Sequence, residues 1–185
     1  GEPIFKIQPL YGSEAWLVTR LDDVRAVLTD NRFSRSATIG VDVARTQPHP
    51  SRETTIVVPR EHIVDTCSFF KALPEGRFDF LSDICGADRG PEEEPRFEVN
   101  YHLFSTTKHH RVRLKVVLSE EDTHVPSVTG VWRTANWHER ETFDLFGVIF
   151  DGHPDLRRIL LPDDWQGHAL RKDFPLRGYE PYSLK

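Results

Sequence analysis

Apolar residues along the chain follow the spacing of strands and then of helices. The run AWLVT at residues 15–19 indicates a strand, and the segment after Asp22 has the apolar spacing of a short helix. A polar connector is expected over residues 34–53. A second strand is predicted at residues 54–59, TTIVVP, and a second helix follows it. The apolar face of that helix has the spacing i, i+4 and i+7, with Ile63, Cys67 and Phe70.

A β-hairpin is predicted in the middle of the chain, after a short strand at residues 78–84 and an acidic turn, PEEEP, at residues 91–95. Two stretches then alternate between apolar and polar positions, with TTKHH between them. Their apolar positions are Phe97, Val99, Tyr101 and Leu103, then Val112, Leu114 and Val116. This period is typical of strands with one buried face, so we expect the hairpin to lie on a core.

A third helix is predicted after Ser127, a residue type favoured as an N-cap, and it ends at Gly147, where a left-handed residue is favoured. Its apolar side carries Trp132, Ala135, Glu139, Phe143 and Phe146. A brief strand is expected at residues 148–150. From residue 151 onward four prolines exclude long regular elements, while leucine and aromatic side chains favour a tail laid against another surface.

These elements predict an α+β fold: a mixed sheet with a β-hairpin, packed by helices on one face, plus an extended irregular C-terminal tail. Three segments are expected, a strand–helix segment over residues 1–50, an α+β domain over residues 51–150 and the tail over residues 151–185. The chain of 185 residues is long enough for a real core. Cys67 and Cys85 lie in different predicted elements and form no CxxC pattern. They are expected to be buried structural thiols rather than a disulfide or a zinc pair.

Charge and hydropathy exclude several partners. The net charge of −5, from 24 basic and 29 acidic residues, creates no broad cationic field, so nucleic-acid binding is not expected. No apolar run approaches the roughly 18 residues of a membrane span, and the N-terminus lacks the pattern of a signal peptide. The chain by itself is expected to be cytosolic.

Catalytic and cofactor motifs cannot be read from the chain. HERET at residues 138–142 fails the zinc-protease pattern HExxH, because Thr142 stands where the second histidine belongs. His138, His153 and His168 are isolated, and such histidines are more often structural groups than metal ligands. No GxSxG, Walker A or GxGxxG loop occurs, and two cysteines are too few for an iron–sulfur cluster. We expect no metal, cofactor or catalytic residue in this chain.

The charged cluster HERETFD favours structural pairing. Glu139 falls among aromatic positions, where a carboxylate is costly unless an arginine meets it, and Arg157 or Arg158 are the candidates. Arg140 and Asp144, at i and i+4, are expected to pair on the surface. A general acid with a raised pKa is the alternative, but it needs a pocket and a second group that the sequence does not locate.

A series of motifs between about residues 52 and 176 resembles one known family. RETTIVVP, FDFLSDICGAD, FEVNYHLFS, VPSV, ANWHERE, FGVIFDGHPDLRRIL and LRKDFP occur in that family's order. The family is the 30-kDa subunit of the proton-translocating NADH:quinone oxidoreductases (respiratory complex I). The resemblance implies a non-catalytic structural subunit, peripheral on the cytoplasmic side of the bacterial inner membrane. FMN, iron–sulfur clusters and quinone are then held by partner subunits, and the chief partner is the 49-kDa quinone-site protein.

The same resemblance marks a signature that we interpret as an interface and turn-locking element. Glu139, Arg140 and Asp144 are expected to fix the GHPDLRRIL turn through charge-assisted hydrogen bonds. The tail is expected to dock on a partner and to become ordered late, with proteolysis of the isolated chain cutting first after Leu160. The predicted signature and interface residues are Glu139, Arg140, Glu141, Asp144, His153, Arg157, Arg158, Trp165, Arg171, Lys172 and Asp173.

The first 45 residues instead resemble the N-terminal strand and helix of bacterial haem-thiolate (cytochrome) monooxygenases, on the stretch PLYGSEAWLVTRLDDVRAVLTDNRFSRSA. The haem-ligating cysteine loop of that fold is missing, so no haem or oxygenase activity is implied. The segment is a fusion, a gene-model error, or simply the leading strand and helix of the domain. Two other functions stay open, a free-standing protein-interaction domain and a metal-dependent hydrolase.

Overall fold

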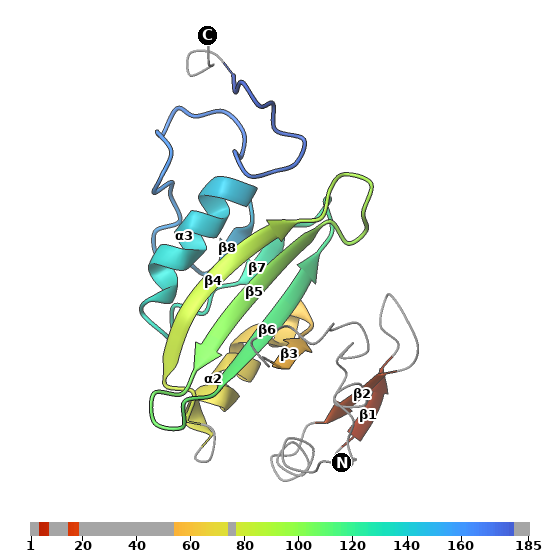
Figure 1. Ribbon diagram of the computed structural model, residues 1–185, viewed down its shortest axis with the longest axis vertical. Coiled ribbons are helices and arrows are strands. Elements are labelled where there is room, and N and C mark those ends of the chain that lie inside the picture. Colours follow the sequence, from red (N-terminus) through yellow and green to blue (C-terminus); the bar gives the residue numbers. More distant parts are fainter. Residues whose placement is uncertain (1–3, 8–14, 19–53, 74–76, 180–185) are drawn as a thin grey trace.

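A mixed four-stranded sheet forms the centre of the computed structural model, which describes residues 4–7, 15–18, 54–73 and 77–179 (Figure 1). The strand order is β3-β6-β5-β4. β4, β5 and β6 are antiparallel neighbours, and β3 is parallel to β6. The bounds are β3 Thr54–Val57, β4 Phe80–Asp88, β5 Phe97–Phe104 and β6 Arg111–Leu118. The α+β fold with a mixed sheet is therefore confirmed.

The hairpin of β5 and β6 is the one that the alternating pattern predicts, and its apolar positions are buried. The bounds predicted for the strand before it, residues 78–84, are wrong. β4 begins at Phe80 and continues to Asp88, because it pairs with the whole length of β5 as far as Phe97. Its second half contains Gly86, which has no side chain, and Ala87, whose side chain is small, so neither contributes much to a periodic apolar pattern.

Two helices, α2 (Ile63–Ala72) and α3 (Ala135–Phe146), cover one face of the sheet and lie behind it in Figure 1. A short 3-10 turn, η2 (Arg60–His62), leads into α2, whose residues Ile63, Cys67 and Phe70 are buried as predicted. Cys85, in contrast, is only half-buried on β4.

The predicted start of the third helix at Ser127 is wrong. α3 begins at Ala135 after Thr134, which makes no side-chain capping bond, and the Ser127 hydroxyl bonds to Glu139 instead. The predicted end is confirmed, because Gly147 has a φ of 77° and its N–H donates to Phe143 O at 2.8 Å.

A pair of short parallel strands flanks α3. β8 (Ile149–Asp151) confirms the brief strand predicted near residue 150, and it pairs with β7 (His124–Pro126), which the sequence pattern did not reveal. β7 has only three residues, too few to show a period.

Two further strands, β1 (Ile4–Ile7) and β2 (Ala15–Val18), form an antiparallel pair near the N-terminus. β2 confirms the strand predicted from AWLVT. The helix predicted after Asp22, the connector over residues 34–53 and most of the segment resembling monooxygenases lie outside the described residues.

The tail, described over residues 152–179, runs from β8 past the end of α3 without a helix or strand (Figure 1). This confirms the prediction made from its prolines. In the described ranges, no helix combines the length and apolarity needed to cross a lipid bilayer.

Candidate functional site

Glu139 lies in the core with its side chain fully shielded from solvent, and its hydrogen-bond donors come from the loop after β7. One carboxylate oxygen accepts the Ser127 hydroxyl at 2.7 Å, and the other accepts the Val128 N–H at 2.7 Å. The expected arginine partner is wrong, because Arg158 binds Asp144 and Arg157 binds Asp155. Burial raises the pKa of Glu139 to about 7, while the two hydrogen bonds act in the opposite direction.

His153 ties the turn after β8 to the first turn of α3. Its Nδ1 accepts the Asp155 N–H at 3.0 Å, and its Nε2 faces Asn136 O at 3.2 Å. This pattern assigns a neutral ring that donates from Nε2. Burial is the main cause that lowers the pKa of His153. Since both ring nitrogens are engaged within the chain, the geometry favours the structural interpretation of this histidine.

Arg140 is buried and bonds to the backbone of the tail. Its Nε donates to Arg157 O at 3.1 Å and its Nη2 to Arg158 O at 2.9 Å, while the guanidinium lies over the Trp137 ring. The predicted surface pair of Arg140 with Asp144 is therefore wrong. Both side chains point into the protein, and each binds the tail rather than the other.

Asp144 is fully buried and collects donors from the tail. Its Oδ2 accepts three successive backbone N–H groups, from Ile159, Leu160 and Leu161, at 3.0, 2.8 and 2.9 Å. Its Oδ1 accepts Arg158 Nη1 at 2.7 Å. Burial opposes ionisation, but these bonds outweigh it and lower the pKa of Asp144. The prediction that Glu139, Arg140 and Asp144 fix the GHPDLRRIL turn agrees with this geometry for Arg140 and Asp144. It is wrong for Glu139, whose hydrogen bonds go to Ser127 and Val128.

The backbone carbonyls in the last turn of α3 are also bonded by the tail. His168 Nδ1 bonds to Asp144 O at 3.0 Å, the Leu170 N–H to Leu145 O at 3.0 Å, and Arg171 Nε to Phe146 O at 2.7 Å. The final carbonyls of a helix have no partner within the helix, and a cation near them is favourable. The tail is thus the C-terminal cap of α3.

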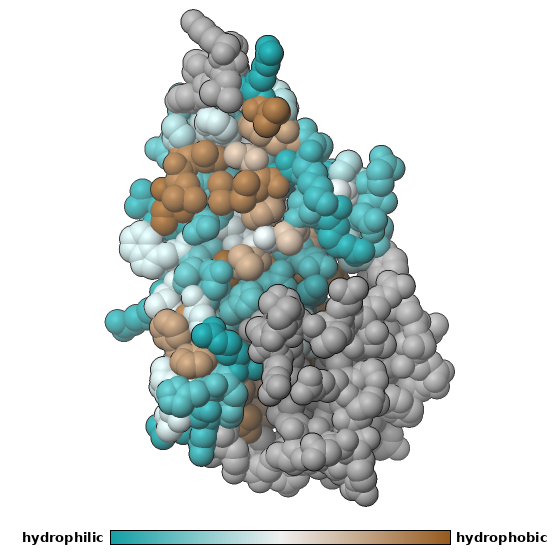
Figure 2. All heavy atoms as spheres, viewed as in Figure 1, coloured by the Kyte–Doolittle hydropathy of each residue, from teal (hydrophilic) through white to brown (hydrophobic). Residues whose placement is uncertain are grey.

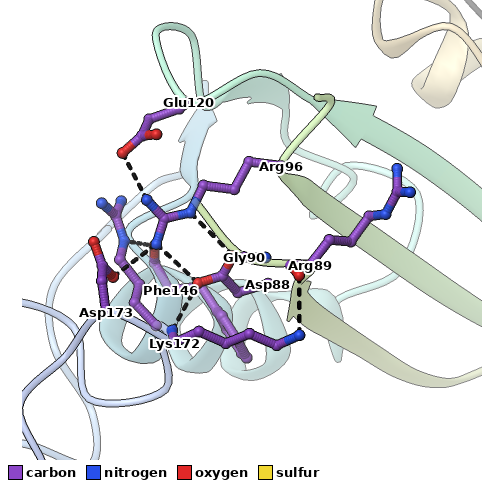
Figure 3. A network of polar contacts seen from close by, with 9 residues as sticks. Asp88, Arg89, Gly90, Arg96, Glu120, Phe146, Lys172 and Asp173 are labelled. Carbon is purple, nitrogen blue, oxygen red and sulfur yellow. Dashed lines mark hydrogen bonds and ion pairs between the residues drawn. The ribbon is translucent and has the colours of Figure 1, made fainter. Parts of the chain in front are cut away.

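A second buried carboxylate, Asp88, holds the tail farther along (Figure 3). Asp88 Oδ2 accepts the Lys172 N–H at 2.7 Å and Arg96 Nη2 at 2.9 Å, and its Oδ1 accepts Arg96 Nε at 3.0 Å and the Gly90 N–H at 2.9 Å. Arg96 continues to Asp173 at 2.7 Å. Burial opposes ionisation of Asp88, but these donors lower its pKa to about 2.

Asp88 and Arg96 are the residues that sequence reasoning missed. Both side chains are 1% exposed, and Arg96 also reaches Glu120. Charged residues of opposite sign at the two ends of a predicted turn could have indicated them, because β4 and β5 bring those ends together. The network contains two predicted residues, Lys172 and Asp173, and places them beside residues that were not predicted.

The remaining predicted residues face outward or close the tail on itself. Arg157 is 66% exposed and Glu141 is exposed. Trp165 stacks on Phe174, with ring centroids 6.0 Å apart, and Tyr179 meets Phe174 edge-on. Four large side chains of the tail are exposed: Leu160, Leu170, Leu176 and Tyr179. Figure 2 shows hydrophobic surface gathered in the region of the tail.

The described residues define a class of protein, an α+β domain in which α3, the helix that carries the signature charges, is capped by the irregular C-terminal segment of the same chain. Within those residues, no group of three or more His, Cys, Asp or Glu side chains could hold a metal ion. The model of the family described as "Respiratory-chain NADH dehydrogenase, 30 Kd subunit" matches residues 56–180. The chain belongs to this 30-kDa subunit family.

Relatives and solved structures agree with this family. The chain is 59% identical over 123 residues to an NADH-quinone oxidoreductase subunit of Rhizobium meliloti (strain 1021), and the match spans 66% of each chain, just under two thirds of the relative. It is 54% identical over 128 residues to an NADH-quinone oxidoreductase subunit of Roseiflexus sp. (strain RS-1), and this match covers 69% of this chain and 73% of that relative.

Two solved structures have a similar fold. One is Nqo5 in a trypsin-resistant fragment (1–134), 40% identical with a TM-score of 0.50, over 55% of this chain and 81% of that chain. The other is a chain of the membrane-bound sulfane sulfur reductase, an archaeal respiratory membrane complex, 26% identical with a TM-score of 0.58, over 67% and 72% of the two chains.

Proposed function

We propose that this chain is a non-catalytic structural subunit in the peripheral arm of a proton-translocating NADH:quinone oxidoreductase. Electrons from NADH would pass through FMN and iron–sulfur clusters in other subunits to quinone. The chief partner is the 49-kDa quinone-site subunit, together with neighbouring subunits of the arm. The location is the cytoplasmic side of the bacterial inner membrane, where the chain is held through the complex.

One observation carries the proposal: the charged side chains of the signature form their hydrogen bonds within this chain. Glu139, Arg140 and Asp144 are buried, and all three bond to backbone groups of the same chain. A catalytic acid or base must reach the proton that it transfers in a bound substrate. Groups in these positions support the structure of the helix and tail instead, which favours a subunit that acts through its shape.

The outer surface of the tail supplies the second part of the argument. Leu160 is 60% exposed and Leu176 is 96% exposed, and Arg157 lies close to Leu160 in the sequence. Protein interfaces are enriched in apolar side chains and arginine, with polar groups at the rim. We therefore assign the docking surface to the exposed side chains of the tail.

Affinity purification of the tagged chain from respiring cells tests the proposal. The wild-type chain should recover the quinone-site subunit and the membrane arm. Arg157→Ala should lower this recovery without changing NADH:quinone turnover per assembled complex, because Arg157 is exposed and bonds to its neighbour Asp155. Arg133→Ala, which removes an exposed arginine just before α3, is the matched control and should recover partners normally.

Other outcomes favour the competing functions. Full assembly of Arg157→Ala with loss of turnover would contradict a purely structural role. Recovery of unrelated partners would favour a free-standing interaction domain. One tightly bound zinc per purified chain, measured by elemental analysis, would favour a metal-dependent hydrolase.

A further inference from the structure

The tail has neither helix nor strand. Between residues 157 and 173, however, its backbone is bonded at successive points to the sheet and helices that precede it, here called the body. We propose that two buried carboxylates, Asp144 and Asp88, lock this segment in place in the isolated chain, before any partner binds. The proposal is opposite to the expectation, based on the prolines, that the tail becomes ordered only on assembly. It concerns the free chain and so goes beyond the proposed function.

The first lock is Asp144 at the end of α3. Three successive N–H groups converge on one carboxylate oxygen, which an extended or fluctuating chain cannot arrange. Arg158 closes the turn from the other side, since its Nη2 donates to Trp165 O and Gly167 O, both at 3.0 Å. Releasing the turn would remove the Arg158 guanidinium and three backbone N–H groups from Asp144 at once, so all of these charge-assisted bonds would have to break together.

The second lock is Asp88 at the end of β4. It accepts the Lys172 N–H, and Arg96 joins it to Asp173, so one arginine bridges a sheet carboxylate and a tail carboxylate. The guanidinium groups of Arg96 and Arg171 both lie over the Phe97 ring, each 4.9 Å from its centroid. The two locks belong to different elements and hold opposite ends of the segment, so they can be removed separately.

A locked tail has a consequence for docking that rests on the proposed function. The backbone N–H groups of Leu160 and Leu170 are both bonded to the end of α3, so their side chains are presented at fixed places. A partner that binds a pre-ordered surface does not have to order it, which leaves more of the contact energy for affinity.

Hydrogen exchange followed by mass spectrometry on the isolated full-length chain tests the locks without any partner. The amides of residues 159–161 and of Lys172 should be protected in the wild type. Asp144→Asn should speed exchange at residues 159–161 by about 10- to 100-fold, because charge-assisted bonds are weakened. Asp88→Asn should do the same at Lys172. Asp163→Asn, an exposed acid in the same segment, is the control and should change neither.

Amides of β5 and β6 report on the body in the same experiment. If an Asp144 variant unfolds the body, Arg158→Gln provides the second test. Arg158 holds the carbonyls of Trp165 and Gly167, so its loss should speed exchange at the Trp165 amide, which is bonded to Pro162 O, while β5 and β6 stay protected. Exchange of residues 159–161 at unstructured rates in the wild type would overturn the proposal. The proposal would also be overturned if Asp144→Asn and Asp88→Asn exchanged at the same rates as the Asp163→Asn control, or if every lock variant unfolded the body.

Failure of the locks and failure of the proposed function are distinguishable. Protected tail amides in a chain that recovers no quinone-site subunit would leave the locks standing and refute the proposed function. A tail that exchanges freely in a chain that assembles normally would refute the locks alone.

Discussion

Three buried carboxylates in this fold differ in the balance between burial, which raises the pKa of a carboxyl group, and hydrogen-bond donors, which lower it. Asp88 and Asp144 each accept bonds from an arginine and from backbone N–H groups, and both have a lowered pKa. Glu139 accepts only the Ser127 hydroxyl and the Val128 N–H, and its pKa is raised to about 7. Burial is the largest influence on each of these pKa values, and the donors outweigh it at Asp88 and Asp144 but not at Glu139.

Glu139 gives the protein a specific dependence of stability on pH. Its folded pKa of about 7 lies above the ordinary value of 4.5, so the folded state binds this proton more tightly. The resulting stabilisation is complete below the unfolded pKa and is lost as the pH rises toward the folded pKa. The difference between the folded and the ordinary pKa of Glu139 corresponds to about 3 kcal/mol of unfolding free energy.

Urea unfolding of the wild type and of Glu139→Gln at pH 5 and pH 8 measures this effect. The wild type should lose up to about 3 kcal/mol relative to the variant over this range, because glutamine stays neutral. His153 and His168, whose pKa values are lowered mainly by burial, act in the opposite direction. His168 is the same in both proteins, whereas His153 Nε2 lies 4.0 Å from Glu139 Oε2, so the measured difference reports on this pair together. Parallel pH curves for the two proteins would show that Glu139 does not titrate in this range.

At the scale of elements, the contact between β4 and α3 depends on a residue without a side chain. A Cβ added at Gly86 would lie 2.5 Å from Cδ2 of Phe146, well inside van der Waals contact. Phe146 is the last residue of α3, where the tail also binds. The sheet and helix can approach this closely only with glycine at that point.

Gly86→Ala is therefore expected to lower the unfolding free energy by about 1–3 kcal/mol, the usual cost of overpacking a well-packed site. Gly130→Ala is the matched control, because a Cβ there would meet no atom within 4 Å. Thermal unfolding of both variants and the wild type checks the prediction. Equal midpoints for Gly86→Ala and Gly130→Ala would mean that Phe146 moves aside at little cost.

Across the whole molecule, local patterns predicted the elements, whereas long-range contacts could not be predicted. The alternation of β5 and β6 and the spacing on α2 depend on neighbours within a few positions, so the sequence shows them. Asp88 and Lys172 are 84 positions apart, and only the folded sheet brings them together. The same holds for Glu139, where a nearby hydroxyl and N–H replaced the arginine that charge balance suggested.

The signature residues were recognised by family resemblance, but their partners depend on the path of the tail. Arg157 and Arg158 are equivalent in the sequence, and the structure turns Arg158 toward Asp144 and Arg157 toward solvent. A turn without regular spacing gives no indication of which of two adjacent side chains faces inward. The inner arginine is therefore expected to matter for the order of the tail and the outer one for assembly.

The exposed leucines of the tail provide the test of the whole molecule as a docking unit. The double variant Leu160→Ser, Leu176→Ser should keep its unfolding midpoint, since both side chains are mostly exposed, but should recover less of the quinone-site subunit from cells. Phe80→Ser, at the end of β4 opposite Asp88, removes an exposed apolar side chain away from the tail and serves as the control. Normal recovery by the double variant, or equal loss with Phe80→Ser, would place the docking surface elsewhere on the chain.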